Sequence, residues 1–151
     1  MSLPAQPGET LRGRYKIREQ IGQGGMGEVW RAEHHLLAHP AAVKLVRPES
    51  IPSADRAVIL KRFEREAKIT ANLTSPHTVD LYDYGVTDDG IVYYVMELCD
   101  GVDLEQLLER WGPMAPARVV HFLRQTCHSL AEAHAAGLMH RDIKPSNLLC
   151  C

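Results

Sequence analysis

The pattern of apolar and polar residues changes along the chain and predicts strands first and long helices later. Residues 28–33 alternate with a period of two, and residues 41–44 and 91–98 are short runs dominated by apolar side chains. Both patterns are typical of β-strands. Residues 62–69 and 117–136 instead repeat with a helical period, and Gly137 is suited to end the second helix. This mixture predicts an α+β fold.

A glycine-rich run precedes the first alternating segment. Residues 21–29 read I-G-Q-G-G-M-G-E-V and contain the spacing G-x-G-x-x-G-x-V. Glycines let a backbone approach phosphates closely and tolerate positive φ. The same spacing marks dinucleotide-binding folds, in which a helix follows the glycines. Here a strand pattern follows, so we expect a hairpin of two antiparallel strands instead of a dinucleotide-binding loop.

The densest set of chemical groups lies between His140 and Asn147. This run reads H-R-D-I-K-P-S-N and holds a carboxylate, two cations and an amide. Phosphoryl transfer uses a carboxylate for the hydroxyl proton, a lysine near the transferred phosphate and an asparagine oxygen for Mg²⁺. The run resembles the catalytic loop of protein kinases, H-R-D-L-x-x-x-N. Lys144 followed by Pro145 is typical of the serine/threonine branch.

Other segments resemble kinase motifs in the order in which the family carries them. Residues 41–44, A-A-V-K, are similar to the third-strand V-A-I-K motif. A single lysine in a strand is otherwise often a surface residue whose stem packs on apolar neighbours. Residues 62–69 resemble helix αC and offer Glu66 as the partner of Lys44, with Glu64 as the alternative. Glu64 is also spaced to pair with Lys68 on a solvated face.

The resemblance implies a bacterial-type serine/threonine protein kinase that uses ATP and Mg²⁺. Asp142 would accept, or at least orient, the proton of the substrate hydroxyl, and Lys144 would stabilise the transferred phosphoryl group. Lys44 and Glu66 complete the implied catalytic set, and Asn147 would bind Mg²⁺. His140 is expected to support the loop by packing and hydrogen bonding and not to act as an acid or base. The implied nucleotide contacts are Ile21, Gly22, Gln23, Gly24, Gly25, Met26, Gly27, Val29, Ala42, Lys44, Met96, Glu97, Cys99, Asp103 and Leu149. Among them, the backbone carbonyl of Glu97 and the backbone groups of Cys99 would pair with the adenine edge.

The resemblance also implies the architecture. Residues 1–14 are expected to be a flexible lead-in, and residues 15–98 a kinase small lobe with a twisted antiparallel sheet plus the αC helix. Residues 99–151 would hold the hinge, the first helices of the large lobe and the catalytic loop. No D-F-G or A-P-E motif follows that loop in these residues, so the large lobe is expected to be truncated and the isolated chain inactive. The alternative is a non-catalytic nucleotide-binding or regulatory interaction fragment.

Composition adds limits to this interpretation. The 151 residues carry a net charge of −2. Nucleic-acid binding is therefore not expected, because it would require a strongly basic surface. No apolar run reaches the roughly 18 residues of a membrane span. We expect a cytoplasmic protein whose partner is a protein with a serine or threonine acceptor, whereas the oligomeric state is not predicted.

Two residues have structural interpretations that the structure can test. Asp103 falls where kinases contact the ribose, and it also has the position of an N-cap with Gln106 at the third helical position. Both roles are compatible. Cys127 is expected in a helix core, because it lies on one apolar face of the helix predicted over residues 117–136. The four cysteines have neither metal-ligand spacing nor the pattern of a secreted disulfide framework.

Overall fold

The computed structural model describes residues 6–24, 27–46 and 55–151 of the chain. The chain divides into two compact units, and each is considered by itself. The first comprises Met1–Ala71 and Asp80–Leu98, and the second comprises Asn72–Val79 and Cys99–Cys151. The segment Asn72–Val79 therefore groups with the second unit, although it lies inside residues 15–98 along the sequence.

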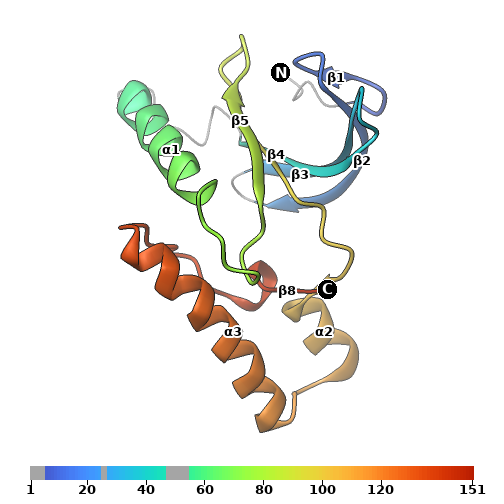
Figure 1. The fold of residues 1–151 in the computed structure, drawn as a ribbon. Helices are drawn as coiled ribbons and strands as arrows, with labels where there is room; N and C mark the ends of the chain where they lie inside the picture. The colour runs from blue at the N-terminus through green and yellow to red at the C-terminus, as the bar shows by residue number, and fades with distance from the viewer. Residues whose placement is uncertain (1–5, 25–26, 47–54) are drawn as a thin grey trace. The chain divides into compact units, whose positions relative to one another are not determined.

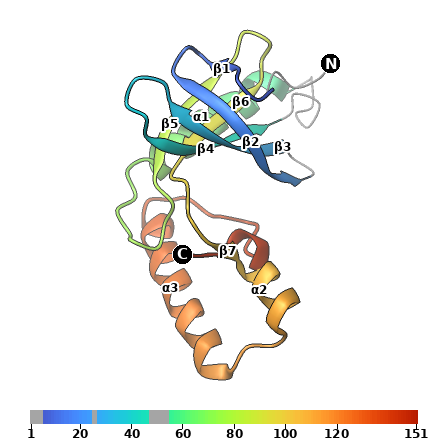
Figure 2. The ribbon, with the colours of Figure 1, turned by 90° about the vertical axis from the view of Figure 1, so that its right-hand side faces the viewer.

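Within its described residues, the first unit consists of a six-stranded antiparallel sheet and one helix, as the family resemblance implied (Figure 1). The strands follow the order β1-β2-β3-β4-β6-β5 across the sheet. The helix α1 spans Arg56–Thr70. The strands are β1 Thr10–Leu11, β2 Tyr15–Gly24, β3 Gly27–His34, β4 Pro40–Val46, β5 Leu81–Val86 and β6 Val92–Met96. Figure 2 shows the strong curl of this sheet.

Apolar side chains cover both faces of the sheet, and the period of two assigns them to the faces. One face carries the larger core cluster, which includes Val43, Leu45 and Val95. The opposite face carries Val46 and Val92, against which residues of α1 pack. Burial on both sides explains why β4 reads as a continuous apolar run instead of an alternating one.

The prediction of a flexible lead-in over residues 1–14 is wrong for residues 6–14, which the structure describes. Thr10 and Leu11 pair with Lys16 and Tyr15 as strand β1. Leu11 is only 9% exposed and belongs to the larger core cluster. A single buried leucine among polar neighbours leaves no periodic signal in the sequence, because a two-residue strand is too short to show alternation.

The glycine run forms the predicted hairpin, in which β2 and β3 pair antiparallel from Tyr15–His34 to Gly24–Gly27. Gly25 and Met26 lie outside the described residues. A Cβ atom on Gly27 would lie 1.8 Å from the backbone oxygen of Leu45, whereas a Cβ on Gly24 would meet nothing within 4 Å. The close approach of β3 to β4 therefore requires glycine at position 27.

Gly27→Ala is expected to destabilise the protein by about 1–3 kcal/mol, because the added methyl group forces the β3 and β4 backbones apart. The free energy of urea unfolding measures this effect. Gly24→Ala is the matched control, since the same methyl group there enters open space. Equal stability of the two variants would contradict the steric explanation.

The second unit combines two helices with a short two-stranded ladder. It contains β7 Val102–Asp103, α2 Leu104–Trp111, α3 Pro116–Ala135, the 3₁₀ turn η3 Pro145–Asn147 and β8 Leu149–Cys150. Proline at the first position starts α3, and Gly137 with φ of 78° follows its C-terminus, as the sequence predicted. The prediction for Cys127 is wrong, because its side chain is exposed on α3.

The segment Asn72–Val79 is attached to α3 through side chains. The Glu132 carboxylate accepts hydrogen bonds from the backbone N–H of Thr74 and of Ser75, each at 2.8 Å, and a third from the Thr74 hydroxyl. These bonds lower the pKa of Glu132. The Thr78 and Ser129 hydroxyls lie 2.6 Å apart and add a further contact. The segment is thus fixed along the last turns of α3.

None of the helices within the described residues is both long and apolar enough to cross a bilayer.

Candidate functional site

Strand register gathers several predicted nucleotide contacts into one row on the first unit. Gly22 pairs with Val29 across β2 and β3, Val29 pairs with Lys44 across β3 and β4, and Lys44 pairs with Tyr94 across β4 and β6. Residues that face each other across antiparallel strands point to the same side of the sheet. The four side-chain positions therefore lie in one line, with Lys44 at its centre.

The next row on the same face joins two more predicted contacts. Ala42 pairs with Met96 across β4 and β6, two residues from Lys44 and Tyr94 in each strand. Ala42 is 6% exposed and Met96 is half-buried, whereas Ile21 on β2 is 45% exposed. The register thus places a small apolar surface beside the row that holds Lys44.

The strand that ends at Met96 continues into Glu97, whose backbone was predicted to contact adenine. The Glu97 N–H donates to the carbonyl of Asp80 at 2.9 Å, and the Glu97 carboxylate accepts from the Asp80 N–H at 3.3 Å. This reciprocal pair fixes the chain after β6. The pair uses the N–H of Glu97. The carbonyl of Glu97, which was predicted to contact adenine, takes no part in it.

The predicted partner of Lys44 is engaged elsewhere in this structure. Glu66 lies on α1, and its carboxylate accepts from Arg62 Nε at 3.0 Å; within the described residues it forms no ion pair with Lys44. Its helix does lie near the row, because the ring centroid of Phe63, three residues before Glu66 on α1, lies 6.4 Å from that of Tyr94, the cross-strand neighbour of Lys44. Burial, Tyr84 and the charge of Glu66 raise the pKa of Tyr94. An exposed pair four residues apart on a helix is worth only about 0.3–0.5 kcal/mol. Arg62 is thus only a weak competitor of Lys44 for the Glu66 carboxylate.

Glu64, the alternative partner, has the solvated role that its spacing predicted. Its carboxylate lies 2.7 Å from Lys68 Nζ, and both side chains are at least half exposed. The hydrogen bond to Lys68 lowers the pKa of Glu64. After burial, the charge of Glu64 helps to raise the pKa of Tyr84, whereas that of Glu66 helps to raise the pKa of Tyr94, the direct cross-strand neighbour of Lys44.

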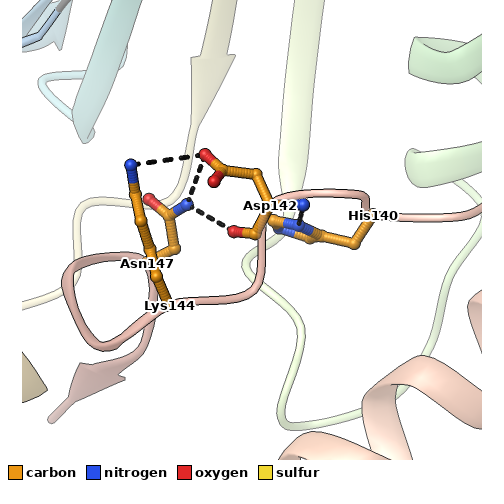
Figure 3. A network of polar contacts seen from close by, with 4 residues as sticks. All are labelled: His140, Asp142, Lys144 and Asn147. Atoms are coloured by element: carbon orange, nitrogen blue, oxygen red, sulfur yellow. Dashed lines mark hydrogen bonds and ion pairs between the residues drawn. The ribbon is translucent and has the colours of Figure 1, made fainter.

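The second unit brings together the catalytic-loop residues that the sequence singled out (Figure 3). The Asn147 side-chain amide donates to the carbonyl of Asp142 at 2.8 Å and to its carboxylate at 3.2 Å. Lys144 Nζ lies 3.5 Å from the same carboxylate oxygen. The Asp142 N–H donates to His140 Nδ1 at 3.2 Å, so His140 supports the loop as predicted. Asp142 is held from both sides while its side chain stays 62% exposed.

Backbone geometry contributes to this arrangement. Arg141 has a φ of 67°, in the left-handed region that non-glycine residues rarely adopt. The turn η3 then directs the chain back, with the Asn147 N–H donating to the carbonyl of Lys144 at 2.9 Å. Strained backbone of this kind concentrates at functional sites, where the surrounding hydrogen bonds maintain it. Here those bonds are the one from the Asp142 N–H to His140 and the one from the Asn147 amide to the Asp142 carbonyl.

The short ladder of the second unit pairs two further predicted residues. Asp103 on β7 lies opposite Leu149 on β8. The Asp103 side chain also accepts from the Gln106 N–H at 2.8 Å, which confirms its N-cap role for α2. Leu149 is 49% exposed, so an apolar side chain is available beside the cap. Cys99 is half-buried in the same unit.

The described residues fit a nucleotide with Mg²⁺. Magnesium prefers oxygen ligands, and since the amide nitrogen of Asn147 is committed to Asp142, its oxygen remains beside an exposed carboxylate. On the first unit, a Cβ atom on Gly24 would meet open space, so the backbone edge of β2 is accessible there. Lys44 supplies a cation in the adjoining row. Taken by itself, each unit thus offers groups of the kind that this ligand requires, a cation and accessible backbone on the first and oxygen ligands on the second.

Comparison with known families agrees with this geometry. Residues 15–151 match the family described as protein kinase domain. This chain belongs to the protein kinase domain family. The hairpin after the glycines excludes the dinucleotide-binding alternative, because a strand and not a helix follows them.

Relatives of this kinase domain include bacterial proteins named as serine/threonine-protein kinases. PknH of Mycobacterium bovis is 44% identical over 140 residues, which is 93% of this chain and 23% of the relative. The kinase pkn3 of Myxococcus xanthus is 38% identical over 142 residues, covering 94% of this chain and 25% of the relative. The crystal structure of the PknI kinase domain of Mycobacterium tuberculosis superposes with a TM-score of 0.83 at 30% identity, covering 99% of this chain and 59% of that one. The chain thus spans about a quarter of the curated relatives.

Two residues of this kinase domain were missed by sequence reasoning. Tyr94 completes the row of Lys44, and its ring centroid lies 5.3 Å from that of Tyr84, with the two ring planes tilted by 51°. Nothing in an apolar run distinguishes one tyrosine from the next. Arg62 was detectable, because it lies four residues before Glu66 and side chains at that spacing meet on a helix. Local spacing alone does not tell which of two cations a glutamate selects.

Proposed function

We propose that this chain provides the nucleotide-binding and catalytic-loop parts of a serine/threonine protein kinase, which transfers the γ-phosphoryl group of ATP to protein hydroxyls. The observation that carries the proposal is the convergence of Lys144 and Asn147 on the exposed Asp142 carboxylate. The lysine and proline at positions 144 and 145 and the names of the relatives support the serine/threonine class.

Asp142 is proposed to accept, or at least orient, the proton of the substrate hydroxyl. Its exposed carboxylate is accessible to a hydroxyl group and accepts a hydrogen bond from the Asn147 amide. The bond from the Asp142 N–H to His140 fixes the backbone at this position. General-base assistance is typically worth about 10²–10⁴ in rate. Lys144 Nζ lies 3.5 Å from that carboxylate. Its positive charge is proposed to stabilise the negative charge on the phosphoryl group during transfer.

The first unit is proposed to supply nucleotide contacts. Lys44 would bind the α- and β-phosphates, and the backbone of Gly22 and Gly24 would approach the phosphates without a Cβ to obstruct them. Glu66 would pair with Lys44 after leaving Arg62. Adenine would lie against Val29, Ala42, Met96 and Leu149, with the backbones of Glu97 and Cys99 on its polar edge and Asp103 near the ribose. Mg²⁺, held by Asn147, would offset phosphate charge when bound.

The remaining parts of the proposal concern partners and compartment. The acceptor is a protein with a serine or threonine hydroxyl, and we propose no nucleic-acid partner for a chain of net charge −2. We place the domain in the cytoplasm, where disulfides are rare, because none of its four cysteines forms a disulfide.

Incubation of the full product of the gene with [γ-³²P]ATP, Mg²⁺ and casein tests the proposal. Label is expected on phosphoserine or phosphothreonine after acid hydrolysis, and it should disappear when Mg²⁺ is chelated. Nucleotide binding is measured in parallel. Binding without transfer would favour a regulatory nucleotide-binding protein, and label on tyrosine would contradict the serine/threonine assignment.

A further inference from the structure

A pocket of about 450 Å³ lies on the second unit, between α3 and the segment Asn72–Val79. Small-ligand sites typically have volumes of about 300–1,000 Å³. The polar part of the lining consists of His77, His121, Arg124, Gln125 and His128. The four residues from α3 recur at intervals of three and four, so they form one stripe along the helix. None of these residues belongs to the proposed nucleotide or catalytic set.

Hydrogen bonds next to the pocket hold its two walls together. The Ser75 hydroxyl, on a residue only 7% exposed, lies 3.1 Å from His128 Nδ1, and it also accepts from the His77 N–H at 3.3 Å. The His77 and His128 rings meet edge to face, with centroids 5.5 Å apart. Glu132 and Ser129 fix the same segment from the next turn of α3. We infer that the pocket is formed before any ligand binds.

Basic groups and N–H donors dominate the polar lining. Arg124 has a permanent positive charge, and the imidazoles and the Gln125 amide add further donors. No lining residue is acidic. Arg124 forms no ion pair with any other residue of the described ranges. Because His128 uses Nδ1 toward Ser75, its Nε2 remains for a ligand.

The lining favours an anion over a metal ion. Within residues 6–24, 27–46 and 55–151, no three histidine, cysteine, aspartate or glutamate side chains are arranged to hold a metal. A guanidinium group has no lone pair that could coordinate a metal ion, whereas its parallel N–H groups match two oxygens of a phosphate. A compact dianion therefore suits Arg124 and the neighbouring histidines better than a metal does.

We propose that this pocket binds a phosphate monoester, with Arg124 as its main contact and His77, His121 and His128 as additional donors. A phosphorylated serine or threonine side chain carries this group, and so does a small phosphorylated metabolite. The proposal concerns a binding site beyond the kinase chemistry and does not depend on phosphoryl transfer at Asp142.

Isothermal titration calorimetry on the full product of the gene tests the proposal. The nucleotide site is first saturated with Mg²⁺ and a non-hydrolysable ATP analogue, so that phosphate does not bind there. The probes are a short phosphothreonine peptide, its unphosphorylated form and inorganic phosphate. We expect the phosphorylated probe to bind and Arg124→Gln to weaken it at least tenfold, with His121→Gln weakening it less.

Arg118→Gln is the matched control, because it removes the same charge from an exposed position of α3 outside the pocket lining. Its affinity should stay within twofold of the unchanged protein. Equal losses in the two arginine variants would overturn the site, since they would indicate only a general charge effect. Failure of both phosphate probes to bind at 10 mM would overturn it as well. Tighter binding of the peptide than of phosphate would identify a phosphorylated protein segment, and equal binding a free phosphate compound.

Discussion

Asp142→Asn is expected to lower the rate of phosphoryl transfer by the full product of the gene about 10²–10⁴-fold, which is the usual contribution of a positioned general base. The amide keeps the size of the side chain and an oxygen that accepts from Asn147, so the loop geometry should persist. The side chain is 62% exposed, and the substitution should change the free energy of unfolding by no more than about 0.5 kcal/mol.

Single-turnover transfer from [γ-³²P]ATP measures this loss, and fluorescence of a bound nucleotide analogue measures affinity separately. Nucleotide affinity should change little, because the role proposed for Asp142 is in the chemical step. Asp89→Asn is the control, since it removes the same charge from an exposed position of the first unit. Retention of more than a tenth of the rate by Asp142→Asn would remove Asp142 from the catalytic assignment.

Lys44→Met is expected to lower the transfer rate by about 10²–10³-fold, which is typical for the loss of one group that stabilises developing charge. Lys44 is half-buried between Val29 and Tyr94, so methionine should preserve the packing of its apolar stem. The fold should therefore remain intact. The alternative, a surface lysine with no role in binding, predicts no change in rate.

Lys16→Met provides the comparison for that variant, because Lys16 is a half-buried lysine of β2 outside the proposed site. Its rate should equal that of the unchanged protein.

The two Lys44 interpretations also differ in the effect of Glu66→Gln. If Glu66 leaves Arg62 for Lys44 when nucleotide binds, Glu66→Gln should slow transfer in the same direction, and an unchanged rate would reject Glu66 as the partner.

Expectations based on neighbouring residues agreed best with the structure. The N-cap of Asp103, the hairpin after the glycines and the end of α3 before Gly137 each depend on contacts within a few residues. The support of Asp142 by His140 is equally local. Such features can be recognised without knowing the rest of the fold, because the interacting groups are always close along the chain.

Expectations that required distant contacts were less complete. Leu11 joins the sheet core because β1 pairs with β2. The polar residues around Leu11 give no sequence pattern that indicates its burial. Cys127 was expected in a helix core, yet packing leaves its face of α3 exposed. Glu66 pairs with Arg62 in preference to Lys44, and only the placement of α1 against the sheet brings it near Tyr94.

The sequence by itself determined the family of this protein and predicted the chemistry of residues 140–147, because these groups lie within eight consecutive residues. Only the tertiary structure decided which side chains share a row with Lys44, since strand register is set by pairing between segments that are far apart in sequence. The structure likewise brought His77 to α3, where a hydrogen bond from the Ser75 N–H to Glu132 and one between Thr78 and Ser129 anchor a segment more than 50 residues away.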